Sequence, residues 1–407
     1  MSVQSRQGRP VVAMVGGGQL ARMTHQAAIE LGQSLRVLAA APDEPAPQVC
    51  PDVVLGDHDV LDDLRRVATG AHALTFDHEG VPTEHLFALQ AEGVVVNPPP
   101  QALMYAQDKL AMRHRLADLG VPVPGFAEVG AVDDVRAFWD RYPGAVVLKA
   151  VRGGYDGRGV WLPETLDEAL AIAHEQLAAG VQVLAEQRVE LARELSAMVA
   201  RSQFGQGAAW PVVETVQRNG QCAVVLAPAP GLSDADAAFA ESLALSLANE
   251  LGVVGVMAVE LFQTPSGEIL VNELAMRPHN SGHWSMDGCT TSQFEQHLRA
   301  VLDYPLGDTA ARAPLTVMAN VLGAAQEPEM SMDERLHHLM ARMPDVKVHM
   351  YGKGERPDRK VGHVNLVGGF DGDREDPEYV ASLRERAERA AHWMATAEWT
   401  DGWSVHG

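Results

Sequence analysis

Short apolar segments alternate with helical segments over the first hundred residues, and this alternation restricts the fold more than any other feature. Apolar runs lie at 10–15, 35–40, 53–54, 73–76 and 94–96, and helical patterns lie between them at 19–31, 60–69 and 82–91. Such alternation predicts a parallel sheet with helices on both faces. Residues 1–100 are therefore expected to form a doubly wound α/β domain that ends at Asn97-Pro98-Pro99-Pro100.

The chain has 407 residues, which is too long for a single core, so further domains are expected. We predict a central domain at 101–310, with a smaller subdomain at about 122–190. Its first helix is expected at 105–119. Residues 311–407 are predicted to form a small C-terminal α+β domain with a basic hairpin.

A glycine turn follows the first predicted strand. Gly16-x-Gly18-x-x-Ala21 has the form of a dinucleotide fingerprint, which also requires an acidic residue at the end of the second strand. That strand ends in Ala39-Ala40-Ala41. A turn that presents helix N–H groups to a different phosphate or to a ribotide fits better. A dinucleotide-dependent oxidoreductase is the alternative.

Two glutamates oppose each other in a predicted hairpin. Apolar runs flank Thr264-Pro265-Ser266-Gly267, and a two-residue loop at Ser266-Gly267 would place Glu260 opposite Glu273. Opposed Cβ atoms lie about 4.5–5.5 Å apart, so the carboxylates repel unless a cation lies between them. A hard divalent cation that bridges to phosphates is expected; the alternative is that both acids face water. The next residues add polar donors that suit an anion: Arg277, His279, Asn280, His283 and Trp284.

Two groups of cations predict anion sites elsewhere in the chain. Lys149 lies in a predicted strand, and the glycine-rich segment 152–160 follows it. Backbone N–H groups and cations of such a loop can close over phosphate, although a plain hairpin loop is the alternative. The second group lies at a hairpin tip that could also be merely solvated, and it consists of Lys353, Arg356, Arg359 and Lys360.

Composition limits the expected partners. The net charge of −22 argues against nucleic acid or an acidic membrane as a partner. Cys50, Cys222 and Cys289 show no metal-binding spacing, which fits a reduced, cytoplasmic setting. We expect neither a signal peptide nor a membrane span, because the N-terminal apolar run leads into a glycine turn and no apolar run is long enough.

These motifs together resemble the ATP-grasp superfamily and, within it, the N5-carboxyaminoimidazole ribonucleotide synthase family of purine biosynthesis. The resemblance extends from residue 11 to about residue 366. It rests on Gly17-Gly18-Gln19-Leu20-Ala21-Arg22-Met23, Gly153-Gly154-Tyr155-Asp156-Gly157-Arg158-Gly159, Arg193-Glu194-Leu195-Ser196, Asn272-Glu273, Arg277, His279-Asn280-Ser281-Gly282-His283-Trp284 and Arg356-Pro357-x-Arg359-Lys360-x-Gly362-His363.

The resemblance implies a ligase reaction. ATP would phosphorylate bicarbonate to carboxyphosphate, and the amine of 5-aminoimidazole ribonucleotide would take up the CO2 unit, with ADP and phosphate released. Mg2+, as two ions, would bind Glu260 and Glu273, and it would neutralise phosphate charge. The central domain would be an ATP-grasp domain whose smaller subdomain is a lid. The protein would be a homodimer.

The resemblance also implies roles for single residues. Bicarbonate and carboxyphosphate would be positioned by Arg277, His279 and Asn280. ATP would contact Lys109, Lys149, Gly153, Gly154, Tyr155, Asp156, Gly157, Arg158, Gly159, Glu186, Gln187, Arg188, Val189, Glu194, Gln217, Asn272 and Glu273. The ribotide would contact Gln19, Leu20, Asp77, Glu79, Lys353, Arg359 and Lys360.

Some positions depart from the family pattern. Lys109 replaces an arginine, so the charge is kept but the bidentate fork is lost. Gln217 replaces a histidine, and Asp77-His78-Glu79-Gly80 replaces Glu-Phe-Glu-Asn. Met276 and Pro278 replace proline and valine. The nearest alternative function is that of a formate-dependent glycinamide ribonucleotide transformylase, and a non-catalytic nucleotide-binding relative is another.

Overall fold

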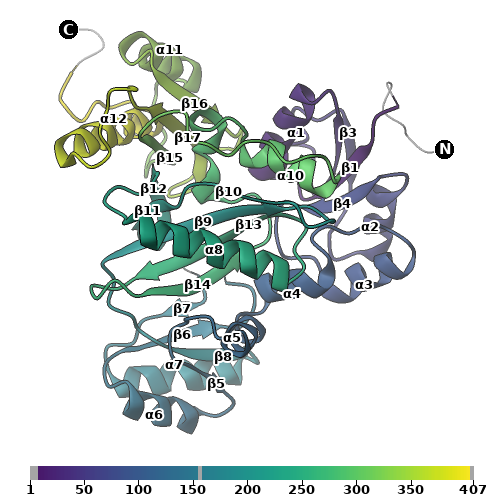
Figure 1. Cartoon of the computed structure of the whole chain (residues 1–407), viewed down its shortest axis with the longest axis vertical. Helices are drawn as coiled ribbons and strands as arrows, with labels where there is room; N and C mark the ends of the chain where they lie inside the picture. The colour runs from purple at the N-terminus through teal and green to yellow at the C-terminus, as the bar shows by residue number, and fades with distance from the viewer. Residues whose placement is uncertain (1–7, 155–157, 404–407) are drawn as a thin grey trace.

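The computed structural model describes residues 8–154 and 158–403. Figure 1 shows the N-terminal part at the right, a lid-like subdomain at the bottom, and a large sheet in the middle that continues to the C-terminal part at the upper left. The ATP contacts implied for Tyr155, Asp156 and Gly157 lie outside the described residues. Among the described residues, no helix combines the length and apolar character needed to cross a membrane.

The N-terminal sheet is parallel, as predicted. Its described strands lie in the order β3-β2-β1-β4, with bounds β1 (Val11–Val15), β2 (Ser34–Ala39), β3 (Asp52–Leu55) and β4 (Ala73–Phe76). The strand predicted at 94–96 is wrong in extent, because Val96 forms only an isolated bridge with Leu74. After Asn97, whose N–H still donates to the Leu74 carbonyl, come Pro98 and Pro99, which cannot donate ladder hydrogen bonds.

Helices cover both faces of this sheet. Val12 and Met14 of β1 pack in one cluster with α1 (Gln19–Glu30) and α10 (Gln293–Val301). Ala13 and Val15 point the other way and pack with α2 (Leu61–Ala68) and α3 (Thr83–Ala91). Because α10 comes from the central part of the chain, the two parts share a core.

The helix predicted at 105–119 is wrong, because two helices take its place. They are α4 (Pro100–Gln107) and α5 (Lys109–Asp118). Asp108 separates them with an extended backbone, and its Oδ1 accepts a hydrogen bond from the Ala111 N–H at 2.9 Å. Aspartate is a favoured N-cap because its short side chain satisfies a free helix N–H. The break places Lys109 at the start of α5.

The lid has a sheet of its own. Its antiparallel strands lie in the order β5-β8-β6-β7, with bounds β5 (Phe126–Val129), β6 (Val146–Ala150), β7 (Val160–Trp161) and β8 (Val183–Gln187). Helices α6 (Val132–Arg141) and α7 (Leu166–Ala178) pack together over it.

One large antiparallel sheet spans the central and C-terminal parts. Its order is β14-β13-β9-β11-β12-β15-β17-β16, and β10 pairs with β9. The bounds are β9 (Arg193–Arg201), β10 (Gly207–Ala209), β11 (Val213–Arg218), β12 (Gln221–Ala227), β13 (Gly255–Gln263), β14 (Ile269–Ala275), β15 (Thr316–Leu322), β16 (Val346–Met350) and β17 (Lys360–Val367). The β12–β15 pair joins the predicted C-terminal domain to the central one without a break in the ladder.

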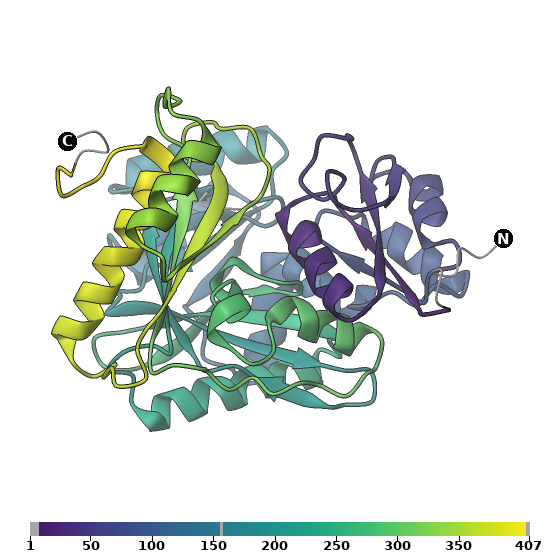
Figure 2. The same ribbon diagram turned by 90° about the horizontal axis from the view of Figure 1, so that it is seen from above.

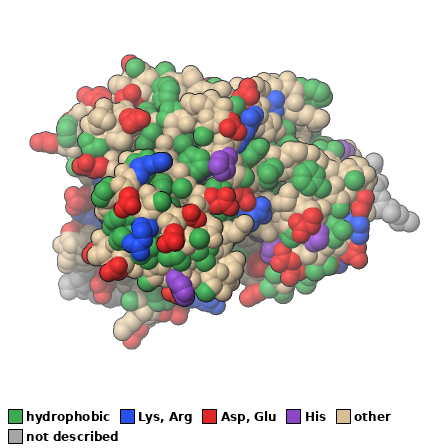
Figure 3. Space-filling view, turned by 90° about the horizontal axis from the view of Figure 1, so that it is seen from below, with side chains coloured by type: hydrophobic (Ala, Val, Ile, Leu, Met, Phe, Trp, Pro, Cys, Tyr) green, Lys and Arg blue, Asp and Glu red, His purple; other side chains and the backbone are tan. Residues whose placement is uncertain are grey.

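Helices cover the large sheet at both ends. α8 (Asp234–Glu250) packs against β9 and β13. α11 (Met332–Arg342) and α12 (Pro377–Thr396) pack beside the C-terminal strands, as Figure 2 shows at the left. Two short turns, η1 (Asn280–Gly282) and α9 (Ser285–Gly288), follow β14. On the face in Figure 3, acidic side chains are dispersed among hydrophobic and uncharged ones.

His297 of α10 connects the N-terminal sheet to β13. Its Nδ1 accepts a hydrogen bond from the Val256 N–H at 3.1 Å, so the proton lies on Nε2, which is 2.7 Å from Thr75 Oγ1. Burial lowers the pKa of His297 to about 3. The buried ring is therefore neutral, and protonation would set an N–H against the Val256 N–H.

We expect His297→Gln to reduce the loss of stability in acid. Between about pH 6.5 and pH 3 the unfolded chain binds a proton at His297 and the folded chain does not, so wild-type stability falls as the pH falls. Glutamine can make both hydrogen bonds but does not titrate. Urea unfolding should show the stability difference between wild type and variant changing by roughly 2 kcal/mol in total between pH 7 and pH 5, because the slope approaches about 1.4 kcal/mol per pH unit only well below pH 6.5. Parallel pH profiles would contradict this reading.

Candidate active site

The hairpin of β13 and β14 places Glu260 directly opposite Glu273, as predicted. The predicted loop is wrong by one residue: the Thr264 N–H donates to the Glu268 carbonyl, so the tip has three residues, and Gly267 has φ 86°. The register then shifts between Glu260 and Leu261, which leaves Asn272 as a bulge. The bulge compensates for the longer tip and restores the pairing of the two glutamates.

Each carboxylate of the pair has a cationic or polar partner. Glu260 Oε1 lies 3.2 Å from His279 Nε2, and Glu273 Oε1 accepts a hydrogen bond from Lys109 Nζ at 3.1 Å. Burial would raise the pKa of Glu260, but the His279 hydrogen bond and nearby charges outweigh burial and lower it. The two carboxylates lie opposite each other and can offer oxygen ligands, and Asn272 adds a side-chain oxygen beside Glu273. This donor set fits Mg2+, which proteins hold through one or two carboxylates together with substrate phosphates.

Glu194 extends the acidic face of the sheet. It lies on β9, and the ladder places it on the same face as Glu260. Burial, with the nearby charge of Glu260, raises its pKa to about 7, and a hydrogen bond with Gln217 opposes this rise. The structure therefore brings together Glu194 and Gln217, both of which the sequence assigned to the nucleotide.

Lys149 lies where the lid meets this hairpin. Its Nζ is 2.5 Å from Glu186 Oε2 and donates to Asn272 Oδ1 at 3.2 Å. Arg113 contacts the other carboxylate oxygen of Glu186 at 2.6 Å. Burial would raise the pKa of Glu186, but the charges of Arg113 and Lys149 outweigh it and lower that pKa. Sequence reasoning singled out Lys149 and Glu186 but missed Arg113.

Other residues assigned to ATP lie around the same junction. Gly154 follows β6, and a Cβ placed there would be 3.8 Å from Lys109 Nζ, so the described start of the glycine-rich loop lies near Lys109. Gly153, Arg158 and Gly159 flank the part of the loop outside the described residues. Gln187 ends β8, and the exposed Arg188 and half-buried Val189 follow it. The ATP contacts implied for residues 186–189 stay a prediction.

The glycine turn at the start of α1 is occupied by side chains of this chain. The Gly18 N–H donates to Asp77 Oδ2, and the Gly17 N–H is bound by the carboxylate of Glu44. Burial raises the pKa of both acids, with Gly18 opposing the rise at Asp77 and Gly17 doing so at Glu44. Two carboxylates therefore occupy the N–H groups that a dinucleotide pyrophosphate would need, which disfavours the oxidoreductase alternative.

Residues assigned to the ribotide surround this turn. Gln19 begins α1 and Leu20 is buried behind it. The ribotide contact implied for Asp77, which is 8% exposed and caps the turn, stays a prediction. Glu44 is an acid that sequence reasoning missed. It lies beyond the end of the second strand, in a Pro-rich loop, so local pattern gave no signal.

Arg277 connects the hairpin region to the N-terminal part. Its Nε donates to Glu79 Oε2 at 2.6 Å. Burial would lower the pKa of Arg277, but Glu79, Asp77 and Glu273 outweigh it and raise that pKa. The guanidinium therefore lies within the electrostatic reach of both the glutamate pair and the glycine turn.

The short turn after Arg277 is fixed by polar contacts. His279 Nδ1 lies 2.8 Å from Ser281 Oγ, which is itself 2.8 Å from Ser196 Oγ on β9. Asn280 and Asn320 exchange amide hydrogen bonds of 3.1 and 2.7 Å. Asn280 therefore faces β15 as well as the turn, and His279 faces Glu260.

The basic hairpin tip reaches toward both halves of this region. Lys353 lies close enough to Asp77 to oppose the rise in the pKa of that carboxyl group, and Lys360 helps to lower the pKa of Glu260. Arg359 Nη1 donates to the Gly354 carbonyl at 3.0 Å, which shapes the tip. Gln48 of the N-terminal part donates to the Gly352 carbonyl at 2.7 Å. The tip is therefore tied to the N-terminal part and lies between the glycine turn and the glutamate pair.

Three imidazole rings stack behind the turn. The ring centroids of His349 and His363 are 4.6 Å apart, and those of His363 and His283 are 4.9 Å apart. Burial lowers the pKa of His283 and of His363 far below the ordinary value. Tyr351 Oη lies 2.8 Å from His363 Nδ1. This stack packs the basic hairpin against the His279–Trp284 turn, and sequence reasoning missed it.

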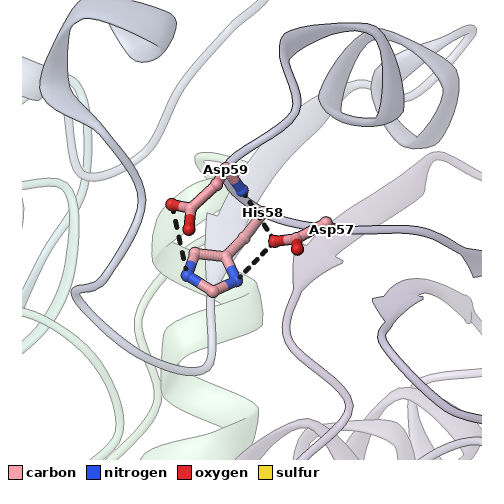
Figure 4. A group of neighbouring side chains, drawn as sticks. All are labelled: Asp57, His58 and Asp59. Atoms are coloured by element: carbon pink, nitrogen blue, oxygen red, sulfur yellow. Dashed lines mark hydrogen bonds and ion pairs between the residues drawn. The ribbon is translucent and has the colours of Figure 1, made fainter.

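A separate group of potential metal ligands lies on the N-terminal part (Figure 4). Asp57, His58 and Asp59 have ligand atoms within 4.8 Å of one another, and it is the one such group of three among the described residues. The Asp59 N–H donates to Asp57 Oδ1 at 3.0 Å. Both aspartates are exposed, so these contacts are those of a polar surface turn.

The N-terminal, central and C-terminal parts of the chain each match a known domain family. Residues 10–107 match the ribonucleotide synthetase preATP-grasp domain, residues 114–294 the ATP-grasp domain, and residues 316–375 the phosphoribosylaminoimidazole carboxylase C-terminal domain. The fold and the site therefore define an ATP-grasp ligase.

Relatives define the family within that class. A protein of Mycobacterium tuberculosis named N5-carboxyaminoimidazole ribonucleotide synthase is 64% identical over 397 residues, which cover 98% of this chain and 90% of the relative. The chain belongs to the N5-carboxyaminoimidazole ribonucleotide synthase family, as its sequence motifs predicted.

Solved structures of synthetases from this family are similar to this chain over nearly its whole length. The Thermus thermophilus synthetase is 35% identical with a TM-score of 0.81, over 97% of this chain and 100% of that one. An Aspergillus clavatus synthase, described in complex with ADP and 5-aminoimidazole ribonucleotide, is 28% identical with a TM-score of 0.82, over 93% and 99%.

Proposed function

We propose that this chain carboxylates 5-aminoimidazole ribonucleotide. ATP and bicarbonate would give carboxyphosphate, and the amine of the ribotide would take up the CO2 unit. Family membership and the complex of the Aspergillus relative support this assignment. The observation that supports it most is that cations from several parts of the chain lie around the glutamate pair. Lys109 and Lys149 lie on the lid side, Arg277 lies beside the pair, and Lys360 comes from the basic hairpin.

The residues divide the proposed reaction between two ends of the site. Lys109, Lys149 and the glycine-rich loop would hold the ATP phosphates, and Glu194 would accept hydrogen bonds from the ribose. Arg277 and His279 would position bicarbonate and then carboxyphosphate. Mg2+, held by Glu260 and Glu273, would supply positive charge to the phosphates. We propose two such ions.

Phosphate release by the pure protein tests the assignment. Hydrolysis of ATP should depend on bicarbonate together with 5-aminoimidazole ribonucleotide. Stimulation by formate and glycinamide ribonucleotide instead would support the transformylase alternative. No turnover with either pair, despite ATP binding, would support a non-catalytic relative.

We expect Lys353→Ala and Arg359→Ala each to raise the KM for the ribotide. The ATP phosphates have Lys109 and Lys149, whereas the ribotide phosphate otherwise lacks a cationic clamp. A charge-assisted hydrogen bond contributes about 1.5–3 kcal/mol, so the KM should rise roughly 10- to 100-fold. Steady-state kinetics should show the KM for ATP nearly unchanged.

The control is Lys347→Ala, which removes an exposed cation of neighbouring β16. It should leave both constants unchanged. If Lys353→Ala and Arg359→Ala weakened ATP and spared the ribotide, the hairpin would belong to the nucleotide site.

We expect ATP to bind more tightly as Glu194 ionises. Its pKa of about 7 means that the carboxyl group is mainly protonated at pH 6 and ionised at pH 8. If only the carboxylate binds the ribose hydroxyls, wild-type affinity should rise about tenfold over this range. Calorimetric titration of Glu194→Gln should show a smaller rise. ATP titrates equally in both proteins, so the difference reports Glu194.

Glu190→Gln is the matched control, since Glu190 is an exposed acid near the lid junction. The ATP affinity of this control should change with pH as it does in wild type. If the ATP affinity of Glu194→Gln changed with pH in the same way, Glu194 would not bind the ribose.

We also propose that the protein is a cytoplasmic homodimer. The family resemblance supports this, and light scattering tests the dimer.

A further inference from the structure

Arg113 is one of the most deeply buried charged residues in the described chain, and it lies beside the proposed phosphate site. Its side chain is 1% exposed, that of Glu186 is 3% exposed, and that of Lys149 is 12% exposed. Arginine is almost never fully buried unless it is paired. Three ionised groups are therefore packed together where α5, the lid strands and the hairpin meet.

The contacts of Arg113 connect two separate sheets. Its Nε donates to Glu186 Oε1 on lid strand β8 at 2.6 Å, and its Nη2 donates to the Asn272 carbonyl on β14 at 2.7 Å. Asn272 is the bulge residue that restores the pairing of Glu260 with Glu273. Its side-chain oxygen accepts from Lys149. Arg113 therefore binds the backbone carbonyl of the bulge residue, and Lys149 binds its side chain.

Glu186 is shared between two cations. Arg113 contacts Oε1, and Lys149 contacts Oε2 at 2.5 Å. A buried carboxylate that loses all its cationic partners carries a large desolvation penalty. Lys149 can therefore turn from Glu186 to a phosphate only if another cation continues to neutralise Glu186. Arg113 is placed to be that cation.

We propose that Arg113 is a positioning residue that keeps Glu186 neutralised and so frees Lys149 for the phosphates of ATP. This inference rests on the proposed nucleotide role of Lys149 but not on the identity of the second substrate. Arg113 itself touches Glu186 and the Asn272 carbonyl, so its effect on ATP passes through Lys149 and the bulge.

The test compares ATP with adenosine, which lacks phosphates. Arg113→Gln leaves Lys149 as the sole cation at Glu186, so we expect ATP to bind roughly 10- to 100-fold more weakly, the range for one lost charge-assisted contact. Adenosine affinity should stay unchanged. Calorimetry in Mg2+ buffer without ribotide or bicarbonate measures both. Equal weakening of ATP and adenosine would show a merely structural role and overturn the proposal.

Two further variants make the test specific. Arg113→Gln with Glu186→Gln removes the buried negative charge, so Lys149 is released and the preference for ATP over adenosine should return to within about threefold of wild type. In a Lys149→Met background, Arg113→Gln should cause no additional loss of ATP affinity. Failure of either result would overturn the proposal.

The double variant Arg113→Gln with Glu186→Gln also keeps the proposal testable if Arg113→Gln alone does not fold. It removes both charges of the pair, which buried sites tolerate better than the loss of one, so its ATP preference alone can support or overturn the proposal. Because these are binding measurements, they stand apart from the assay of the carboxylation reaction. The expected affinities could be found in a chain that has no ribotide-dependent turnover, and they could be absent in an active enzyme. Failure of this proposal is therefore distinguishable from failure of the proposed function.

Discussion

Glu273→Gln will reduce turnover by about 10²–10³-fold at saturating Mg2+. The change keeps the shape of the side chain but removes half of the negative charge of the proposed metal pair, and the loss of one preorganised electrostatic contact has effects of this size. The fold should survive, because Glu260 keeps its contact with His279. Initial rates over a Mg2+ titration, with melting curves, measure both effects.

Glu268→Gln is the matched control for this variant. Glu268 is an exposed acid near the tip of the same hairpin, so its removal should leave the rate and the Mg2+ dependence unchanged. Wild-type turnover by Glu273→Gln at saturating Mg2+ would refute the role of the glutamate pair as metal ligands.

Arg277→Ala will lower both stability and turnover. Glu79 Oε2 would lose its cation, and Glu79 Oε1 is buried with no partner among the described residues. Breaking such a pair costs about 3 kcal/mol when it is well buried. Loss of the cation beside the proposed bicarbonate site should lower kcat by about 10²–10³-fold.

A second change separates the two effects of Arg277→Ala. Combined with Glu79→Gln, it should regain most of the stability, because no buried charge is left unpaired, while kcat stays low. Arg277→Lys should keep part of the activity, since lysine keeps the charge but not the planar fork. Recovery of kcat in the double variant would show that Arg277 acts only through stability.

In the glutamate hairpin, the predicted pairing of Glu260 with Glu273 is correct because two differences from the predicted hairpin cancel. Period and turn chemistry predicted a two-residue tip, but the tip has three residues with Gly267 in the left-handed region. The bulge at Asn272 then returns Glu273 to its place opposite Glu260. Turn residues indicate where a hairpin bends, but they do not determine whether a later bulge corrects the register.

Local signals predicted the parallel N-terminal sheet and its helices α1, α2 and α3. The break at Asp108 was missed although aspartate is a common N-cap, because apolar residues continue on both sides. Arg113, Glu44 and the histidine stack could not be predicted. Their partners are distant in sequence: Arg113 and Glu186 are 73 residues apart. Such contacts depend on how whole elements pack.

The predicted C-terminal domain shows a different limit. Its α+β character and basic hairpin were expected, but the bounds of β15, α11 and α12 were not, and these elements pack in a core of their own. Sequence pattern gave no sign that β15 would pair with β12, since an edge strand and a central strand can have the same alternation.

That pairing determines which part of the site can move. A ladder of hydrogen bonds runs without a break from β14, which carries Glu273, to β16 and β17, which lead into the basic hairpin. A hinge between the glutamate pair and the basic hairpin would have to break this ladder. The lid strands form a separate sheet among the described residues, so the lid can rotate as a rigid body without loss of ladder hydrogen bonds. The basic hairpin and the glutamate pair therefore keep a fixed geometry relative to each other, and adjustment to the nucleotide that we propose is confined to the lid.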